Sequence, residues 1–242
     1  MVTSSLDIQL PRPAGERKLY VAAALVAAAL VFAGFAPTFY LRSAFGSPEL
    51  STLKVVHGVV MTAWFTLFIV QARLVATGRT ATHRKLGVAG IALALGVLVL
   101  GTELGIASAR AGVAPVPGIS PLVFLVMPIG EMVVFAILVT AGIALRRRPA
   151  YHKRLMLLAS VAMLTPAMAR LSLRLLPAGG PPIFFGLADL VILGCIAYDT
   201  ARNRRLHPAF AWGFAVVILG QFGRLALSQT PQWMAFAKWL VG

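Results

Sequence analysis

Charged residues are scarce in this chain of 242 residues. They make up 12% of it, whereas a soluble globular domain carries about 25%. Hydrophobic residues make up 59%, and the mean hydropathy is +0.87. This composition excludes a soluble globular protein, and it also excludes a disordered one, because disorder requires low hydrophobicity and high charge density. It predicts an all-α, polytopic membrane protein.

Cysteine and acidic residues are rarer still. The single cysteine, Cys195, lies in an apolar run, so the sequence excludes an intramolecular disulfide, a zinc-thiolate site and a redox dithiol. Only 7 acidic residues stand against 22 basic ones, which gives a formal net charge of +15. In a soluble protein this excess would suggest nucleic acid as a partner. Membrane topology explains it here, and we expect no nucleic-acid partner.

Seven stretches are long and apolar enough to cross about 30 Å of hydrocarbon, which takes about 20 residues. They run from Leu19 to Leu41, Ser51 to Ala76, Arg84 to Ala109, Ser120 to Leu145, His152 to Leu176, Pro182 to Ala201 and Pro208 to Ser228. The tail from Gln232 to Val241 is too short to span and predicts an interfacial helix. We therefore predict a cytoplasmic segment (1–18), one transmembrane domain (19–228) and an interfacial tail (229–242).

The basic residues predict the orientation. Fifteen of the 22 lie in the N-terminal segment or around the connections after spans 2, 4 and 6, namely Arg12, Arg17, Lys18, Arg73, Arg79, Arg84, Lys85, Arg146, Arg147, Arg148, Lys153, Arg154, Arg202, Arg204 and Arg205. The positive-inside rule places the N-terminus in the cytoplasm and the C-terminus outside, in a multi-pass protein of the inner membrane. This basic face also suits anionic lipid headgroups, although a plain topology signal explains it.

Two short motifs echo each other at the starts of spans 3 and 5. They are His83-Arg84-Lys85-Leu86-Gly87 and His152-Lys153-Arg154-Leu155-Met156. With the block from His57 to Gln71, they resemble a family of bacterial membrane proteins with a domain of unknown function. Members of that family carry His-Arg-Arg-Leu-Gly and, in a later span, His-Arg-Arg-Trp-Met. The resemblance covers roughly residues 50–177; it supports the class of protein and implies no reaction.

Polar residues gather at one depth in the predicted outer third of the membrane. They are His57, Glu103, Arg170, Arg174, Asp189 and Arg224, while Glu131 lies about 16 Å deep, near the midplane. Ionisable groups at these depths cost several kcal/mol when they face lipid, so we expect them to face the bundle interior or water. The three carboxylates would then oppose the three arginines.

Two interpretations of this layer stay open. The charges form a structural network of ion pairs, or they line an outward-facing polar cavity that binds a small ligand or relays protons. Arginines with His57 suit a carboxylate or an anionic headgroup, whereas the carboxylates suit a cation or a proton. Gln71 shares one helix face with His57 and completes the candidate ligand-binding set.

Haem is a further alternative, because membrane cytochromes of the b type hold haem between histidines of two helices. His83 and His152 share the predicted inner level and are the candidate cofactor ligands, with His57 as another. Alternatively, these histidines contact lipid phosphate.

No hydrolase elbow, phosphate-binding loop or metalloprotease motif is present, so we propose no catalysis. Pro128 and Pro166 predict kinks within their spans.

Overall fold

The computed structural model describes residues 14–116, 118–175 and 180–242, and within these ranges every regular element is a helix. The helices are α1 (Ala14–Phe35), the π-helical turn η1 (Ala36–Tyr40), α2 (Thr52–Ala76), α3 (Thr80–Arg110), α4 (Pro121–Phe124), α5 (Val126–Ala144), α6 (Pro149–Ala162), α7 (Thr165–Leu175), α8 (Gly180–Asn203), α9 (Pro208–Leu227) and α10 (Pro231–Val241). Most of the segment predicted at 1–18 lies outside the described residues.

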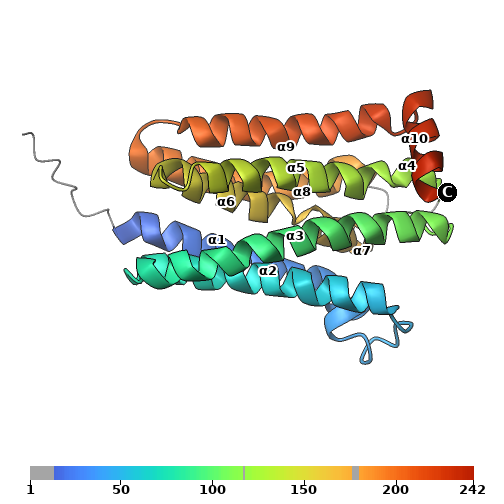
Figure 1. Ribbon diagram of the computed structural model, residues 1–242, viewed down its shortest axis with the longest axis horizontal. Helices are drawn as coiled ribbons and strands as arrows, with labels where there is room; N and C mark the ends of the chain where they lie inside the picture. The colour runs from blue at the N-terminus through green and yellow to red at the C-terminus, as the bar shows by residue number, and fades with distance from the viewer. Residues whose placement is uncertain (1–13, 117, 176–179) are drawn as a thin grey trace, which may run out of the picture.

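The prediction of an all-α protein with seven spans is confirmed. Within the described ranges, seven helical stretches are long and apolar enough to cross a membrane: Lys18–Tyr40, Thr52–Ala76, Thr80–Arg110, Pro121–Ala144, Pro149–Leu175, Gly180–Asn203 and Pro208–Leu227. They run side by side along the long axis of the molecule (Figure 1). The chain is therefore a multi-pass membrane protein, and the span ends lie within a few residues of those predicted.

The fifth span, made of α6 and α7, lies at the centre of the bundle. In its most apolar window 72% of the residues are buried, against 11% in the second span. Proline explains its discontinuity, because Pro166 has no N–H to bond to the carbonyl four residues earlier. A turn at Met163 and Leu164 therefore separates α6 from α7, and Leu125 likewise separates α4 from α5 just before Pro128. Both predicted interruptions are present.

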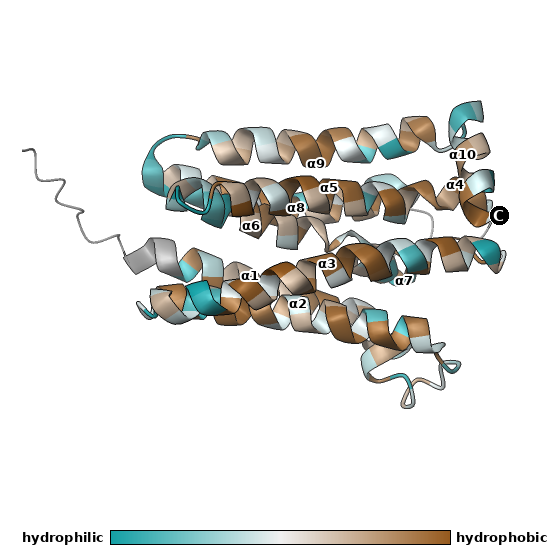
Figure 2. Ribbon diagram, viewed as in Figure 1, coloured by the Kyte–Doolittle hydropathy of each residue, from teal (hydrophilic) through white to brown (hydrophobic). Residues whose placement is uncertain are grey.

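The hydrophilic residues mark the two ends of the bundle (Figure 2). We call the end that carries the α2–α3, α5–α6 and α8–α9 connections the basic end, because it holds the arginine-rich segments 146–148 and 202–205. The opposite end is the far end. The sides between the two ends are apolar, and α2 and α3 expose valine and leucine side chains such as Val59, Val88 and Leu95.

The C-terminal helix α10 packs at the far end instead of extending α9 (Figure 1). The Trp233 indole N–H donates to the Leu122 carbonyl at 2.9 Å, and the Arg110 guanidinium donates to the carbonyl of Val241 at 2.7 Å. Trp239 stays exposed. The tail is thus a short helix that does not span, as the sequence predicts, with one face on α3 and α4.

Candidate functional site

Four polar side chains from α5, α8 and α9 meet inside the far half of the bundle, and we call them the Glu131 cluster. Its members are Glu131, Asp189, Gln221 and Arg224. The Arg224 guanidinium lies 3.7 Å from Glu131 Oε2, and the Gln221 amide donates to Asp189 Oδ1 at 2.9 Å. Glu131, Gln221 and Arg224 are buried. The cluster ties three helices together.

A glycine makes the Arg224 contact possible. A Cβ at Gly130 would lie 2.5 Å from Cγ of Arg224, so the aliphatic stem of the arginine packs against the bare backbone there. The guanidinium then reaches the carbonyls of Gly220 at 3.0 Å and Met127 at 3.3 Å. It also lies 5.0 Å from the centre of the Phe185 ring. Arg224 is therefore held by several partners besides Glu131.

Arg170 occupies a different environment, between α7 and the end of α1. Its guanidinium carbon lies 4.1 Å from the centre of the Phe35 ring, and it donates to the carbonyl of Pro166, one turn earlier, at 3.1 Å. His57 lies close enough to interact electrostatically with Arg170. The Nδ1 atom of His57 is buried and has no hydrogen-bond partner within the described ranges. We call Phe35, His57 and Arg170 the Arg170 site.

A close helix crossing forms the Arg170 site. A Cβ at Gly34 would lie 2.8 Å from backbone atoms of Ala167, so glycine lets α1 approach α7 closely. Phe35, the next residue, then covers Arg170. Arg174 lies near enough to Arg170 to interact electrostatically, but its side chain is exposed. Within the described part of the chain, the charged groups that interact with Arg170 are basic.

The predicted layer of three carboxylates opposite three arginines forms only in part, around Arg224, which Glu131 and Asp189 both approach closely enough to interact electrostatically. Among the residues that the structure describes, only Glu131 and Arg224 of that set form an ion pair. Glu103 is exposed instead of facing the bundle interior. The reason is the helix phase: Gly101 faces Met132 in α5, and two residues further along the helix point about 200° away.

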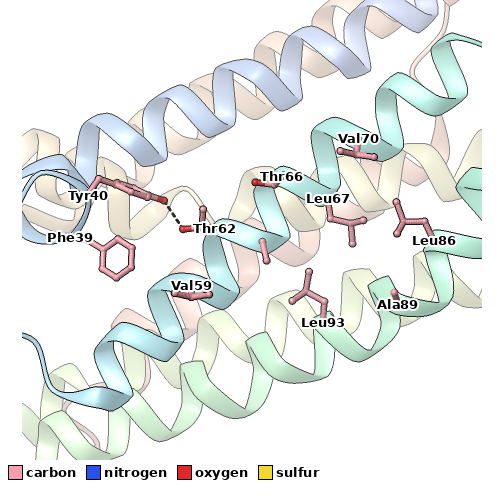
Figure 3. A pocket seen from close by; sticks show the side chains of 11 residues that line it. Phe39, Tyr40, Val59, Thr62, Thr66, Leu67, Val70, Leu86, Ala89 and Leu93 are labelled. Carbon is pink, nitrogen blue, oxygen red and sulfur yellow. Dashed lines mark hydrogen bonds between the residues drawn. The ribbon is translucent and has the colours of Figure 1, made fainter.

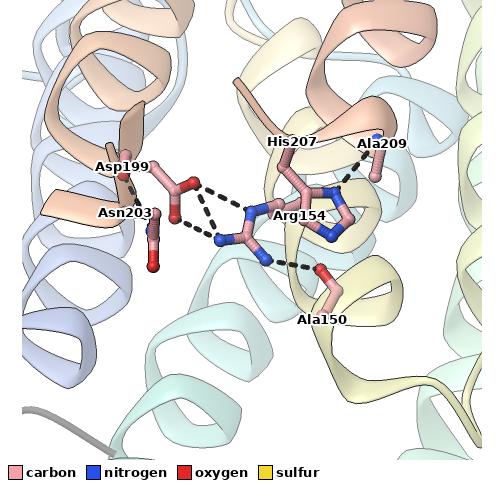
Figure 4. Close-up of polar contacts among 6 residues, drawn as sticks. All are labelled: Ala150, Arg154, Asp199, Asn203, His207 and Ala209. Atoms are coloured by element: carbon pink, nitrogen blue, oxygen red, sulfur yellow. Dashed lines mark hydrogen bonds and ion pairs between the residues drawn. The ribbon is translucent and has the colours of Figure 1, made fainter. Parts of the chain in front are cut away.

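Among the described residues, the shorter of the two ion pairs joins Arg154 of α6 to Asp199 of α8, a pair that was not expected from the sequence (Figure 4). The guanidinium Nη2 lies 2.8 Å from both carboxylate oxygens, and Nε lies 3.0 Å from Oδ2. Arg154 is 3% exposed and Asp199 is 1% exposed. Arg154 also donates to the Ala150 carbonyl at 2.8 Å. This forked, buried pair at the basic end fastens the central span to α8.

His207 lies beside this pair, in the connection before α9. Its Nδ1 atom accepts a hydrogen bond from the Ala209 N–H at 3.1 Å and so caps the start of α9 (Figure 4). Burial lowers the pKa of His207 from its ordinary value, and the positive charge of Arg154 lowers it further, while Asp199 partly opposes them. The neutral ring is the form that can accept the capping bond.

The structure brings together the two candidate cofactor ligands, His83 of α3 and His152 of α6. Their ring centres lie 6.1 Å apart with an interplanar angle of 77°. Gln71 belongs with this pair and not with His57, because its amide N–H donates to the His83 carbonyl at 3.3 Å. His57 and Gln71 share the inward face of α2, but about 21 Å of helix separates them.

Two hollows lie away from all of these groups. A groove of about 760 Å³ between η1, α2 and α3 has an apolar lining that includes Val59, Leu67 and Leu93 (Figure 3). Tyr40 and Thr62 share a hydrogen bond of 2.9 Å between it and a smaller hollow of about 160 Å³. None of the predicted site residues lines either hollow. Both suit the hydrocarbon chains of surrounding lipid.

Comparison with known proteins adds no assignment. No family model, no curated protein and no solved structure matches the chain. The resemblance to a bacterial membrane-protein family therefore stays a prediction, and the function has to be argued from the groups described above.

Proposed function

We propose that this chain is a protein of the bacterial inner membrane that binds a small oxyanion, a carboxylate or a phosphate group, at the Arg170 site. No catalysis is part of the proposal. The observation that supports it is the half-buried guanidinium of Arg170, which has no carboxylate partner among the described residues.

An arginine within a membrane span calls for a partner that offsets the cost of its charge. A charged side chain within the hydrocarbon region costs several kcal/mol unless it is paired or hydrated. The cation–π contact with the Phe35 ring offsets about 2 kcal/mol of this cost when the cation is desolvated. Of the five N–H donors of the Arg170 guanidinium, the structure directs one to the Pro166 carbonyl. The planar fork of the remaining donors matches the two oxygens of a carboxylate or phosphate.

The sign of the site favours an anion over a cation or a proton. Arg174 and His57 add positive charge, or the capacity for it, beside Arg170. The His57 ring is hydrogen-bonded to the Leu100 backbone, and protonation of its unpartnered Nδ1 would supply a donor to an anion. A cation would meet repulsion here, whereas an oxyanion would supply the missing counter-charge.

The structural alternative applies to other residues. Arg224 with Glu131, and Arg154 with Asp199, each supply their own counter-charge within the chain. Such pairs fix helix packing and leave no charge for a ligand to neutralise. The two interpretations of the polar residues are therefore divided between sites: ion pairs in the Glu131 cluster and at the basic end, and a ligand at Arg170.

Thermal unfolding in a non-ionic detergent tests the proposal. The probes are hexanoate for a free acid, a dioctanoyl lipid with a phosphate monoester headgroup for an acidic lipid, and dioctanoylglycerol as the uncharged match. A ligand at 100 times its Kd stabilises the folded state by about 2.7 kcal/mol. We expect at least one acidic probe to raise the melting temperature, and the uncharged lipid to leave it unchanged.

Variants assign the effect to the site. Arg170→Gln removes the charge and is expected to abolish the stabilisation by the acidic probe while changing the melting temperature in its absence only slightly. Arg202→Gln alters an exposed arginine at the basic end and serves as the matched control. Equal stabilisation of the two variants would show that the anion binds elsewhere, and no stabilisation of the wild type by either acidic probe would refute the proposal.

A further inference from the structure

The two histidines that open the echoing motifs face each other across α3 and α6. Each begins the pattern histidine, two basic residues, leucine, at residues 83–86 and 152–155. The repeated pattern thus positions two imidazoles, from separate spans, with ring centres 6.1 Å apart at the basic end. Both rings are half-buried. This pair is separate from the Arg170 site and plays no part in the function proposed above.

Hydrogen bonding fixes the state of the His152 ring. Its Nδ1 atom lies 2.8 Å from the Gly142 carbonyl. A carbonyl only accepts, so Nδ1 carries the proton, and Nε2 of the neutral ring keeps its lone pair. A bond from one ring nitrogen to a backbone carbonyl is the arrangement that orients metal-ligating histidines.

Two further atoms beside the histidine pair have lone pairs that accept no hydrogen bond. His83 Nδ1 and Gln71 Oε1 are both buried and have no hydrogen-bond partner within the described part of the chain. The Gln71 amide nitrogen is already engaged with the His83 carbonyl, which fixes the direction of the side chain. Unpartnered buried polar atoms are uncommon in proteins and call for a ligand or water.

The separation of the rings suits a shared metal. Metal–nitrogen bonds are about 2.0–2.1 Å long. With about 1.1 Å more from each nitrogen to its ring centre, two imidazoles on one metal would have centres about 5 Å apart in tetrahedral geometry and about 6 Å apart when they lie on opposite sides of the metal, as they do at a haem iron. We propose that His83 and His152 are ligands of one transition-metal centre between α3 and α6, with Gln71 as a supporting group. A free ion and a haem iron share this coordination chemistry.

The metal content and the visible spectrum of the purified full-length chain test the proposal. We expect close to one metal per chain by elemental analysis, or a strong Soret band if the source is haem. Zinc or copper without a Soret band identifies a free ion, and iron with a Soret band identifies haem. A preparation that lacks metal is titrated with Zn²⁺, Cu²⁺ and haemin.

Variants decide whether the histidine pair is the site. His83→Ala and His152→Ala are expected to weaken binding by more than about tenfold, since even the loss of an outer partner of a metal ligand costs 10–100-fold. His207→Asn, which alters a half-buried histidine outside both proposed sites and keeps an acceptor at the start of α9, is the matched control. Gln71→Ala is a milder change that tests the pair if a histidine variant misfolds.

Two results would overturn the proposal. One is wild-type protein that carries no metal and binds none of the three titrants. The other is binding that the His83→Ala, His152→Ala and Gln71→Ala variants all retain at wild-type strength. Either result leaves the oxyanion proposal untouched, because stabilisation by the acidic probe depends on Arg170 and is measured separately.

Discussion

Loss of Arg154 should destabilise the protein more than loss of any exposed arginine. The side chain makes three contacts of 3.0 Å or less to the Asp199 carboxylate, and both residues are almost fully buried. Arg154→Met retains much of the apolar volume but leaves a buried carboxylate without its counter-charge. Breaking a buried pair in this way costs about 3–5 kcal/mol.

This loss of free energy converts to a measurable shift. For a chain of this length each kcal/mol lowers the melting temperature by about 2–4 °C, so Arg154→Met should lower it by about 6–20 °C. Arg84→Met changes an exposed arginine of the echoing motif at the same end and should leave the melting temperature nearly unchanged. Thermal unfolding in detergent, followed by circular dichroism, compares the two variants.

A double variant tests whether the loss comes from the orphaned carboxylate. Arg154→Met with Asp199→Leu removes both charges and replaces them with apolar side chains of similar size, which is often neutral in buried pairs. We expect the double variant to recover much of the lost stability, because contacting residues show coupling energies of about 0.5–3 kcal/mol. A loss below about 1 kcal/mol for Arg154→Met, or a double variant as unstable as the sum of the single changes, would refute this reasoning.

Three further predictions concern packing, pH and topology. Gly34→Ala places a Cβ 2.8 Å from the α7 backbone and should lower the melting temperature, whereas Gly194→Ala, with open space around it, should be neutral or stabilising. Because the folded-state pKa of His207 is lowered, its contribution to stability is present above the ordinary value of 6.5 and is lost as the pH falls from there through the lower folded-state pKa. His207→Asn keeps a capping acceptor and should reduce this pH dependence of the melting temperature, so an unchanged dependence would count against it. Single cysteines introduced after removal of Cys195 test the orientation. A cysteine at position 118 should react with an impermeant thiol reagent in intact cells, and one at position 147 should not. The reverse labelling pattern would show that the protein has the opposite orientation.

The spans could be predicted from the sequence because hydrophobic length is a local property of the chain. The same local reasoning found the interruptions at Pro128 and Pro166, since proline acts on its own helix. Depth in the membrane also follows from counting residues. These three quantities need no knowledge of which helix packs against which.

The direction in which a side chain points around its helix axis could not be predicted in this way, because it depends on which helices pack against that helix. Glu103 lies in the third span as expected, yet its side chain is exposed because the helix presents Gly101 to α5. Asp199 was overlooked because it lies at the end of its span, where charged residues usually face water. One signal was available in the sequence, namely a carboxylate among the basic residues of segment 198–205. Gln221 had a comparable signal, since it precedes Arg224 by three residues and so shares its helix face.

Native mass spectrometry of the purified chain, released from non-ionic micelles, tests the central claim most directly. Wild-type protein incubated with the acidic probe that stabilises it should carry one bound molecule, and a titration should saturate at that ratio. Removal of a charge-assisted hydrogen bond costs about 1.5–3 kcal/mol, so Arg170→Gln should weaken the binding by about 10–150-fold. Arg202→Gln should bind like the wild type. Retention of the bound acid by Arg170→Gln at wild-type affinity would contradict the assignment of this site.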